Sequence, residues 1–303
     1  MQGKQVWLAS LMSTTMLLSA CGGGDGDGAG TVNSGGSTSN GTTAGAPATT
    51  TPAAPSPTST TTPPAAQAAC RATHNVTYSG SASQIAANNG QLAVVVVPSL
   101  PVAYSKNRNM TAPNAPASSQ VQQASGAFTT LASSAAATDC LGLDHGAVTE
   151  IQSAGSDVAI GRWNQAEDTD GNTYTYQQGV HYAVGTPLTL TATSGTLACT
   201  QLMADTITSG DGGLSGTLGT ATATLDLGTR TLNNLSLSVN INNTLSTLTQ
   251  AQAPLNGVSS GGTLSVQSVV VGHDAPQPLI AVGYSTTQGN SAGIGGVVVL
   301  SCR

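Results

Sequence analysis

The stretch ATATLDLGTRTLNNLSLSVNIN, residues 221–242, decides the fold class of this chain. Apolar and polar side chains alternate strictly over residues 221–227 and again over residues 235–241. An apolar residue at every second position is typical of a β-strand with one buried face. Gly228 and Thr229 lie between the two runs, so the stretch predicts a β-hairpin.

Other parts of the chain carry similar β-type runs. Residues 91–98, QLAVVVVP, are continuously apolar and predict a strand buried on both faces. Further strands are expected at residues 148–152, 158–163, 180–184, 196–203, 263–271, 278–284 and 295–301. From about residue 148 onward, roughly nine strands are expected, which are too many for one flat open sheet of that size. Closure into a barrel would remove the exposed edges.

We therefore predict an all-β fold with an antiparallel up-and-down β-barrel of about eight strands at residues 147–303. A small mixed N-terminal part of the folded domain is expected at residues 70–146. Within it, the Ala-rich residues 124–138 predict one helix, and residues 106–119, rich in Asn, Pro and Ser, predict a long loop.

The N-terminal residues predict export and lipid anchoring. Lys4 precedes an apolar segment that is too short for the about 20 residues of a membrane-spanning helix. The segment ends in Leu18-Ser19-Ala20-Cys21, which resembles the lipobox of bacterial lipoproteins. The resemblance implies that residues 1–20 are a signal peptide and that acyl chains on Cys21 hold the protein in the outer membrane, at its periplasmic face or at the cell surface. A secretory signal followed by an ordinary cysteine is the alternative.

Residues 21–69 are expected to form a disordered linker that starts at the lipidated cysteine. The segment is rich in Gly, Ser, Thr and Pro and has no apolar periodicity, so it buries too little surface to offset its ordering entropy. A flexible coil of this length spans roughly 35–40 Å. The folded domain is therefore expected to stand off the membrane.

Four cysteines remain after Cys21 is assigned to the lipid. An even number in an exported protein predicts two disulfides, for which three connectivities exist. Cys70–Cys140 and Cys199–Cys302 are favoured, because each bond then stays within one half of the domain. No two of these cysteines have the close spacing that is usual in zinc sites.

Composition excludes some functions. The formal net charge is −6, the sequence pI is near 4.8 and 7% of residues are charged, which argues against nucleic acid as a partner. The aromatic content of 3% argues against a membrane-spanning barrel, because such barrels carry aromatic girdles.

Short Gly-rich motifs resemble a known family. They are GRWN at 161–164, GVHYAVG at 179–185 and SGTL at 215–218, which leads to LDL at 225–227. Residues 147–302 are in this respect similar to the barrel lobe of transferrin-binding-protein-B-like surface lipoproteins. The resemblance implies an eight-stranded barrel behind a lipobox and a flexible linker. The family's Phe/Tyr-Gly-Pro signature near the last strands is missing, so only the architecture, and no protein ligand, is carried over.

Two motifs resemble functional sites but lack the rest of the pattern. Gly289-Asn290-Ser291-Ala292-Gly293 matches G-x-S-x-G, but a strand is expected to follow it, and no Asp, Glu or His comes after Ser291. Residues 167–172, EDTDGN, resemble the start of a calcium loop, but position twelve counted from Asp168 is Gly179. Both segments are therefore predicted to be hairpin loops, with a weak surface calcium site as an alternative for the second.

His74, His145, His181 and His273 are far apart in the sequence, and no pair has metal-ligand spacing. No metal site and no cofactor are therefore predicted. A nucleophile, a base and an acid cannot be assembled from the sequence either, so the protein is not expected to be an enzyme.

A binding role is the favoured function, and a structural envelope lipoprotein without a specific ligand is the alternative. Trp163 is the only tryptophan after the signal peptide, and it is expected in the core or at an end of the barrel rather than at a ligand. Candidate ligand contacts are Trp163, Tyr174, Tyr176 and Tyr284, together with Tyr104. The ligand, a protein or a small molecule, is not specified.

Overall fold

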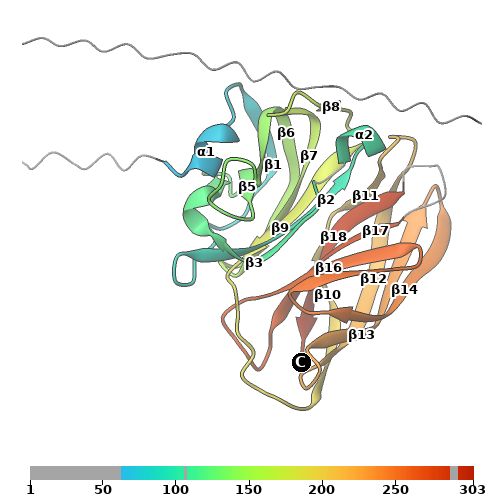
Figure 1. The fold of residues 1–303 in the computed structure, drawn as a ribbon. Coiled ribbons are helices and arrows are strands. Elements are labelled where there is room, and N and C mark those ends of the chain that lie inside the picture. The colour runs from blue at the N-terminus through green and yellow to red at the C-terminus, as the bar shows by residue number, and fades with distance from the viewer. Residues whose placement is uncertain (1–62, 106–107, 287–292) are drawn as a thin grey trace, which may run out of the picture. The chain divides into compact units, whose positions relative to one another are not determined.

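The computed structural model describes residues 63–105, 108–286 and 293–303, and its regular secondary structure is mostly β-strand (Figure 1). The all-β class is confirmed. Most of the predicted linker lies outside the described residues, and so does the lipobox. The end of the predicted linker is ordered: helix α1, Ala65–Ala69, buries Ala66 and begins the described domain.

The first sheet contains nine strands in the order β3-β2-β9-β7-β6-β5-β4, with β1 beside β6 and β8 beside β7. The pairs are antiparallel except for β1 and β6, which are parallel. Helix α2 (Val102–Ser105) and the turn η1 (Ala117–Ser119) lie in its connections. The strands are β1 Val76–Gly80, β2 Gln91–Ser99, β3 Met110–Pro116, β4 Val121–Gln122, β5 Phe128–Ala132, β6 Cys140–Ala154, β7 Val158–Asp168, β8 Thr173–Tyr174 and β9 Gly179–Gly185.

The second sheet also contains nine strands and is entirely antiparallel. Its path is β14-β13-β12-β10-β18-β17-β16-β15, with β11 beside β12 and β18. Most strands pair with a strand close in sequence, whereas β14 and β15 lie at the two ends of the path. The pair β10–β18 joins the beginning of the region to its end, which gives a half-barrel. The strands are β10 Thr196–Ala204, β11 Thr206–Ser209, β12 Ser215–Asp226, β13 Thr231–Ile241, β14 Thr244–Pro254, β15 Gly257–Gly261, β16 Leu264–Val271, β17 Leu279–Thr286 and β18 Ile294–Cys302.

The predicted hairpin at residues 221–242 is present as β12 and β13. The two strands pair antiparallel, with Asp226 opposite Thr231 at the turn end. The Asp226 carboxylate accepts hydrogen bonds from the backbone N–H groups of Gly228 and Thr229, at 2.8 and 2.9 Å. These bonds satisfy donors that the turn would otherwise leave unpaired.

The predicted boundary between residues 146 and 147 is corrected, because β6 runs across it. Strand β2 pairs with β9, far along the chain, so residues 70–146 complete a sheet instead of forming a small mixed extension. The helix expected at residues 124–138 is also wrong. That segment contains strand β5, whose five residues are all buried, and packing in a sheet overrides helix propensity there. The loop expected at residues 106–119 includes β3.

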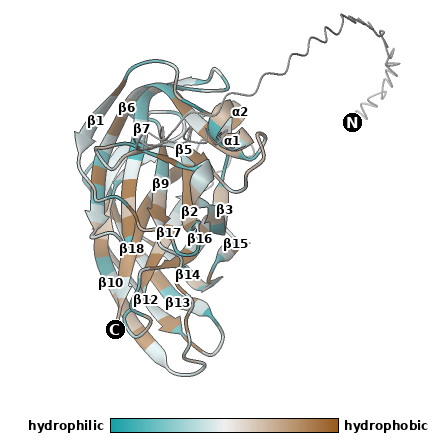
Figure 2. Ribbon diagram, turned by 90° about the vertical axis from the view of Figure 1, so that its left-hand side faces the viewer, coloured by the Kyte–Doolittle hydropathy of each residue, from teal (hydrophilic) through white to brown (hydrophobic). Residues whose placement is uncertain are grey.

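Three apolar clusters fill the domain, and several strands, β2 and β18 among them, contribute residues to two clusters each. Hydrophobic residues recur along these strands (Figure 2). In β2, Val94 and Val96 face the core of the first sheet, whereas Val95 and Val97 face the second sheet. In β18, alternate residues likewise face the half-barrel core or the first sheet. The continuous apolar run at residues 91–98 is therefore a strand buried on both faces, as predicted.

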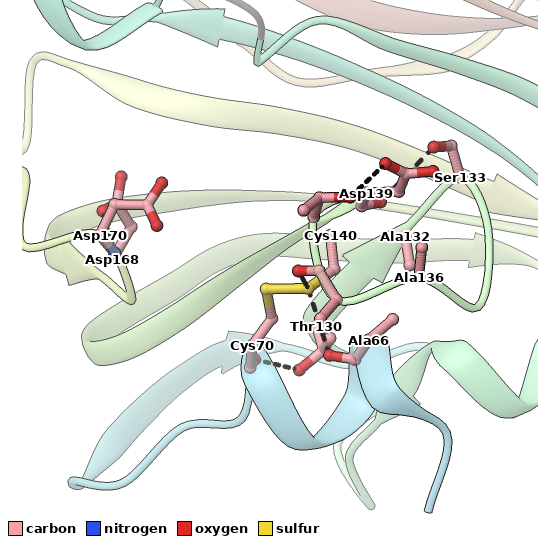
Figure 3. The surroundings of a disulfide bond; sticks show 12 residues. Ala66, Cys70, Thr130, Ala132, Ser133, Ala136, Asp139, Cys140, Asp168 and Asp170 are labelled. Carbon is pink, nitrogen blue, oxygen red and sulfur yellow. Dashed lines mark hydrogen bonds between the residues drawn. A yellow bond between two sulfur atoms is a disulfide. The ribbon is translucent and has the colours of Figure 1, made fainter. Parts of the chain in front are cut away.

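Both favoured disulfides are present. Cys70 follows α1 and is bonded to Cys140 at the start of β6 (Figure 3). The Thr130 hydroxyl donates a hydrogen bond of 2.7 Å to the Cys70 carbonyl beside this bond. Cys199 and Cys302 are direct neighbours across the β10–β18 pair and form the second bond.

Candidate functional site, a polar cleft between the sheets

A cleft of about 600 Å³ lies where turns of the two sheets meet the connection after β9. This volume is within the about 300–1,000 Å³ range of small-molecule sites. Amide side chains dominate its polar lining, and one guanidinium joins them. The lining residues are Asn88, Asn89, Gln91, Pro113, Asn114, Pro187, Leu188, Thr189, Leu190, Arg230, Leu255, Asn256 and Val270.

Hydrogen bonds to backbone carbonyls fix the walls of the cleft. Leu188 N–H donates to the Val270 carbonyl at 3.2 Å, which attaches the connection after β9 to β16. The Asn88 side-chain amide donates to the Pro187 carbonyl at 3.0 Å, which attaches the same connection to the first sheet. Leu255 N–H donates to the Arg230 carbonyl at 2.9 Å, so two turns of the half-barrel are also held together.

Three lining residues have left-handed backbone conformations: Asn89 at φ 51°, Arg230 at φ 57° and Asn256 at φ 53°. Asparagine adopts this region readily, because its short amide can bond locally. Arginine has no such advantage, so the left-handed backbone of Arg230 costs conformational energy that contacts with the surrounding structure must offset. Strained residues of this kind gather at functional sites more often than elsewhere.

Arg230 is the only cation among the described residues that line the cleft. Its Nη2 donates to the Leu190 carbonyl at 3.0 Å, which fixes the direction of the guanidinium. Its Nη1 is buried and has no hydrogen-bond partner among the described residues. A buried donor without a partner costs about 1–3 kcal/mol, so an acceptor from a ligand would be stabilised here.

The aromatic residues predicted as ligand contacts do not form one surface. Trp163 and Tyr284 are fully buried, and Tyr174 is 5% exposed. Trp163 donates from Nε1 to the Phe128 carbonyl at 2.8 Å inside the first core, which is the core position considered for it. Tyr176 is exposed but lies outside the cleft, as does Tyr104 in α2.

A second polar cluster is buried between the sheets. His181 Nε2 lies 3.1 Å from Ser99 Oγ and 2.8 Å from Thr208 Oγ1, and its Nδ1 contacts the Asp205 carboxylate. Carboxylate, imidazole and hydroxyl are ordered here as in a hydrolase triad. All four residues are at most 4% exposed and none lines the cleft, so we assign this cluster a structural role between the sheets.

The segment that resembles a calcium loop has another cation beside it. Arg108 contacts the carboxylates of both Asp168 and Asp170. The other Asp168 oxygen accepts the backbone N–H groups of Asp170 and Asn172, which makes the predicted turn between β7 and β8. The G-x-S-x-G segment lies outside the described residues, apart from its last glycine.

Two histidines that are far apart in the sequence lie close together in the fold. His74 and His145 both contact the Asp144 carboxylate, because β1 pairs with β6 and brings these distant segments side by side. No local sequence pattern indicates this contact, since two strands can pair in parallel whatever the number of residues between them in the sequence.

No family model, curated protein or solved structure matches this chain. The likeness of residues 147–302 to transferrin-binding-protein-B-like lipoproteins therefore stays a prediction from short motifs. The helices of the described residues are too short to cross a membrane.

Proposed function

We propose that this protein is a lipid-anchored protein of the bacterial envelope that binds a hydroxyl-rich, carboxylate-bearing small molecule in the cleft between its sheets. An acidic sugar is the simplest ligand of that class. The observation that carries the proposal is the buried, unpartnered Nη1 of Arg230 at the edge of a cleft lined with amides.

The chemistry of the lining matches this class of ligand. Asparagine side chains both donate and accept hydrogen bonds, so they suit sugar hydroxyls, which do the same. A guanidinium binds a carboxylate through charge-assisted, directional hydrogen bonds. Leu188, Leu190 and Leu255 add apolar surface against which a ring can pack.

The location is supported by independent features of the chain. The lipobox at Leu18-Ser19-Ala20-Cys21 and the Pro-rich linker fit an exported, tethered domain. Two disulfides fit an oxidising compartment. The order of the strands from β10 to β18 supports an up-and-down barrel of about eight strands as the form of the C-terminal part. A binding role, rather than a catalytic one, fits a cleft whose described lining residues include no nucleophile paired with a base.

The binding proposal is tested by titrating the full-length protein, in detergent, with oligosaccharides that contain sialic or uronic acids and with their neutral counterparts. Acidic sugars should bind and neutral ones should bind more weakly. Arg230→Gln should remove this preference, whereas Arg303→Gln, at an exposed arginine outside the cleft, should keep it. Equal binding of acidic and neutral sugars, or equal losses in the two variants, would refute the proposal and favour a structural envelope protein.

The anchoring proposal has a separate test. Cys21→Ser should release the protein from the membrane fraction, and mass spectrometry of the wild-type N-terminal peptide should find acyl chains on Cys21. Protease treatment of intact cells then distinguishes the cell surface from the periplasmic face. An unmodified Cys21 would show that the protein is not a lipoprotein.

A further inference from the structure

His74, Asp144 and His145 lie together at the surface of the first sheet. Strand β1 runs parallel to β6 with Val76 opposite Gly146, and the His74 N–H donates to the Asp144 carbonyl at 3.3 Å. The Cys70–Cys140 disulfide ties together the same two segments a few residues earlier. Two backbone links and a covalent bond therefore fix the segments that carry these side chains.

The three side chains converge on one carboxylate oxygen. Asp144 Oδ2 lies 2.7 Å from His74 Nδ1 and 3.1 Å from His145 Nδ1. The ligand atoms all lie within 4.8 Å of one another, and the two imidazole rings meet edge to face with centroids 5.7 Å apart. We propose that these three residues bind a divalent transition-metal ion, with zinc as the most suitable probe.

Thr73 holds the other carboxylate oxygen. Its hydroxyl lies 2.5 Å from Asp144 Oδ1, and its backbone N–H donates to the same atom at 3.3 Å. Oδ1 is therefore occupied, and Oδ2 is left to face the imidazoles. Partners of this kind orient metal-binding carboxylates, and their loss usually weakens metal affinity.

The donor set selects the class of ion. Imidazole nitrogen suits zinc, copper, nickel and iron, whereas calcium and magnesium prefer a shell made entirely of oxygen. Two histidines and one carboxylate leave further coordination positions open. Those positions would face solvent, since the His74 and His145 side chains are 68% and 47% exposed.

A second exposed histidine offers a matched comparison. His273 Nδ1 lies 2.8 Å from both oxygens of Asp157, but no other His, Cys, Asp or Glu completes a three-ligand group there among the described residues. It therefore reproduces the exposed His–carboxylate contact without the second imidazole. The proposed metal site also shares no residue with the cleft, so each proposal can fail without the other.

The test is calorimetric titration of zinc into the tag-free, full-length protein in detergent, after treatment with a chelator. One zinc ion per chain should bind with micromolar or tighter affinity. His74→Ala and His145→Ala should each weaken binding beyond detection, and Thr73→Val should weaken it by about 10–100-fold. His273→Ala should bind zinc like the wild type. Crystals soaked in zinc should show an anomalous peak beside Asp144 Oδ2.

Unchanged thermal unfolding of the exposed-histidine variants will confirm that they are folded. Absence of zinc binding to the wild type would overturn the proposal, as would zinc affinity that survives both substitutions. Equal losses in His273→Ala and His145→Ala would also overturn it, because binding would then be a nonspecific property of surface histidines.

Discussion

His181 Nδ1 lies 2.5 Å from Asp205 Oδ2, and both side chains are fully buried between the two sheets. His181 belongs to β9 of the first sheet, whereas Asp205 lies between β10 and β11 of the second. The remaining Asp205 oxygen accepts the Val297 N–H at 2.8 Å. This contact lies in an interface to which β2, β9, β16 and β18 contribute a cluster of buried apolar side chains.

Asp205→Ala is expected to destabilise the protein by about 3–5 kcal/mol, because it leaves the Nδ1 atom of His181 buried without its carboxylate partner. Urea unfolding measures the loss. Asp157→Ala is the control, since it removes the carboxylate of the exposed His273 pair and should change stability little. Similar losses in the two variants would mean that the buried pair contributes no more than a surface contact.

The pair His273–Asp157 predicts a pH dependence. The hydrogen bond to Asp157 and its negative charge raise the pKa of His273 above its ordinary value of 6.5. A raised pKa in the folded state stabilises the fold below the unfolded pKa, and this contribution disappears as pH rises through the folded pKa. The difference in unfolding free energy between the wild type and His273→Gln should therefore be largest below pH 6.5 and vanish in alkaline solution. A difference that grows as pH rises would contradict this.

Gly283 in β17 predicts a tight contact between the sheets. A Cβ added there would lie 2.5 Å from Val97 Cγ2 and 2.6 Å from Val95 Cγ1. Gly283→Ala should therefore overpack the interface and cost about 1–3 kcal/mol. Gly219→Ala in β12 is a matched control, because its nearest neighbour would be at 3.5 Å. The unfolding temperature of Gly283→Ala should be well below that of Gly219→Ala. The reverse order would show that the interface can relax around the added methyl group.

The Cys199–Cys302 bond links the first and last strands of the half-barrel. Replacing both cysteines with alanine should cost about 2–5 kcal/mol, because the open chain gains conformational freedom on unfolding. Urea unfolding of the double variant measures this cost, and peptide mapping without reductant should recover the 199–302 cross-link from the wild type. Free thiols at both positions would contradict the pairing.

Local periodicity predicted the second half of the fold well. Each strand expected between residues 148 and 301 is present, since those segments alternate apolar and polar side chains or bury both faces. Strand β14 was missed because most of its residues are exposed and carry no apolar pattern, Leu245 among them at 70% exposure. The wrong boundary between residues 146 and 147 has another origin. Strand β2 pairs with β9, and no local sequence pattern indicates that these two distant segments are neighbours.

The candidate sites were less accessible to sequence analysis. The sequence predicted a turn beside Arg230, but not that residues 187–190 would pack against that turn and form a cleft. The aromatic residues were reasonable ligand contacts by type, but Trp163 and Tyr284 fill cores instead. His74 and His145 are 71 positions apart in the sequence. They meet because β6 lies beside β1 as its parallel neighbour.

The position of the Cys70–Cys140 bond has a mechanical consequence. Tension applied at residue 63 would unwind α1 and then reach Cys70 before it reaches β1. From Cys70 the load can pass through the sulfur atoms into β6, which is paired along much of its length with β7. Strand β1 would then be spared from peeling, and His74 would keep its place beside Asp144 while the domain is pulled by its N-terminal end.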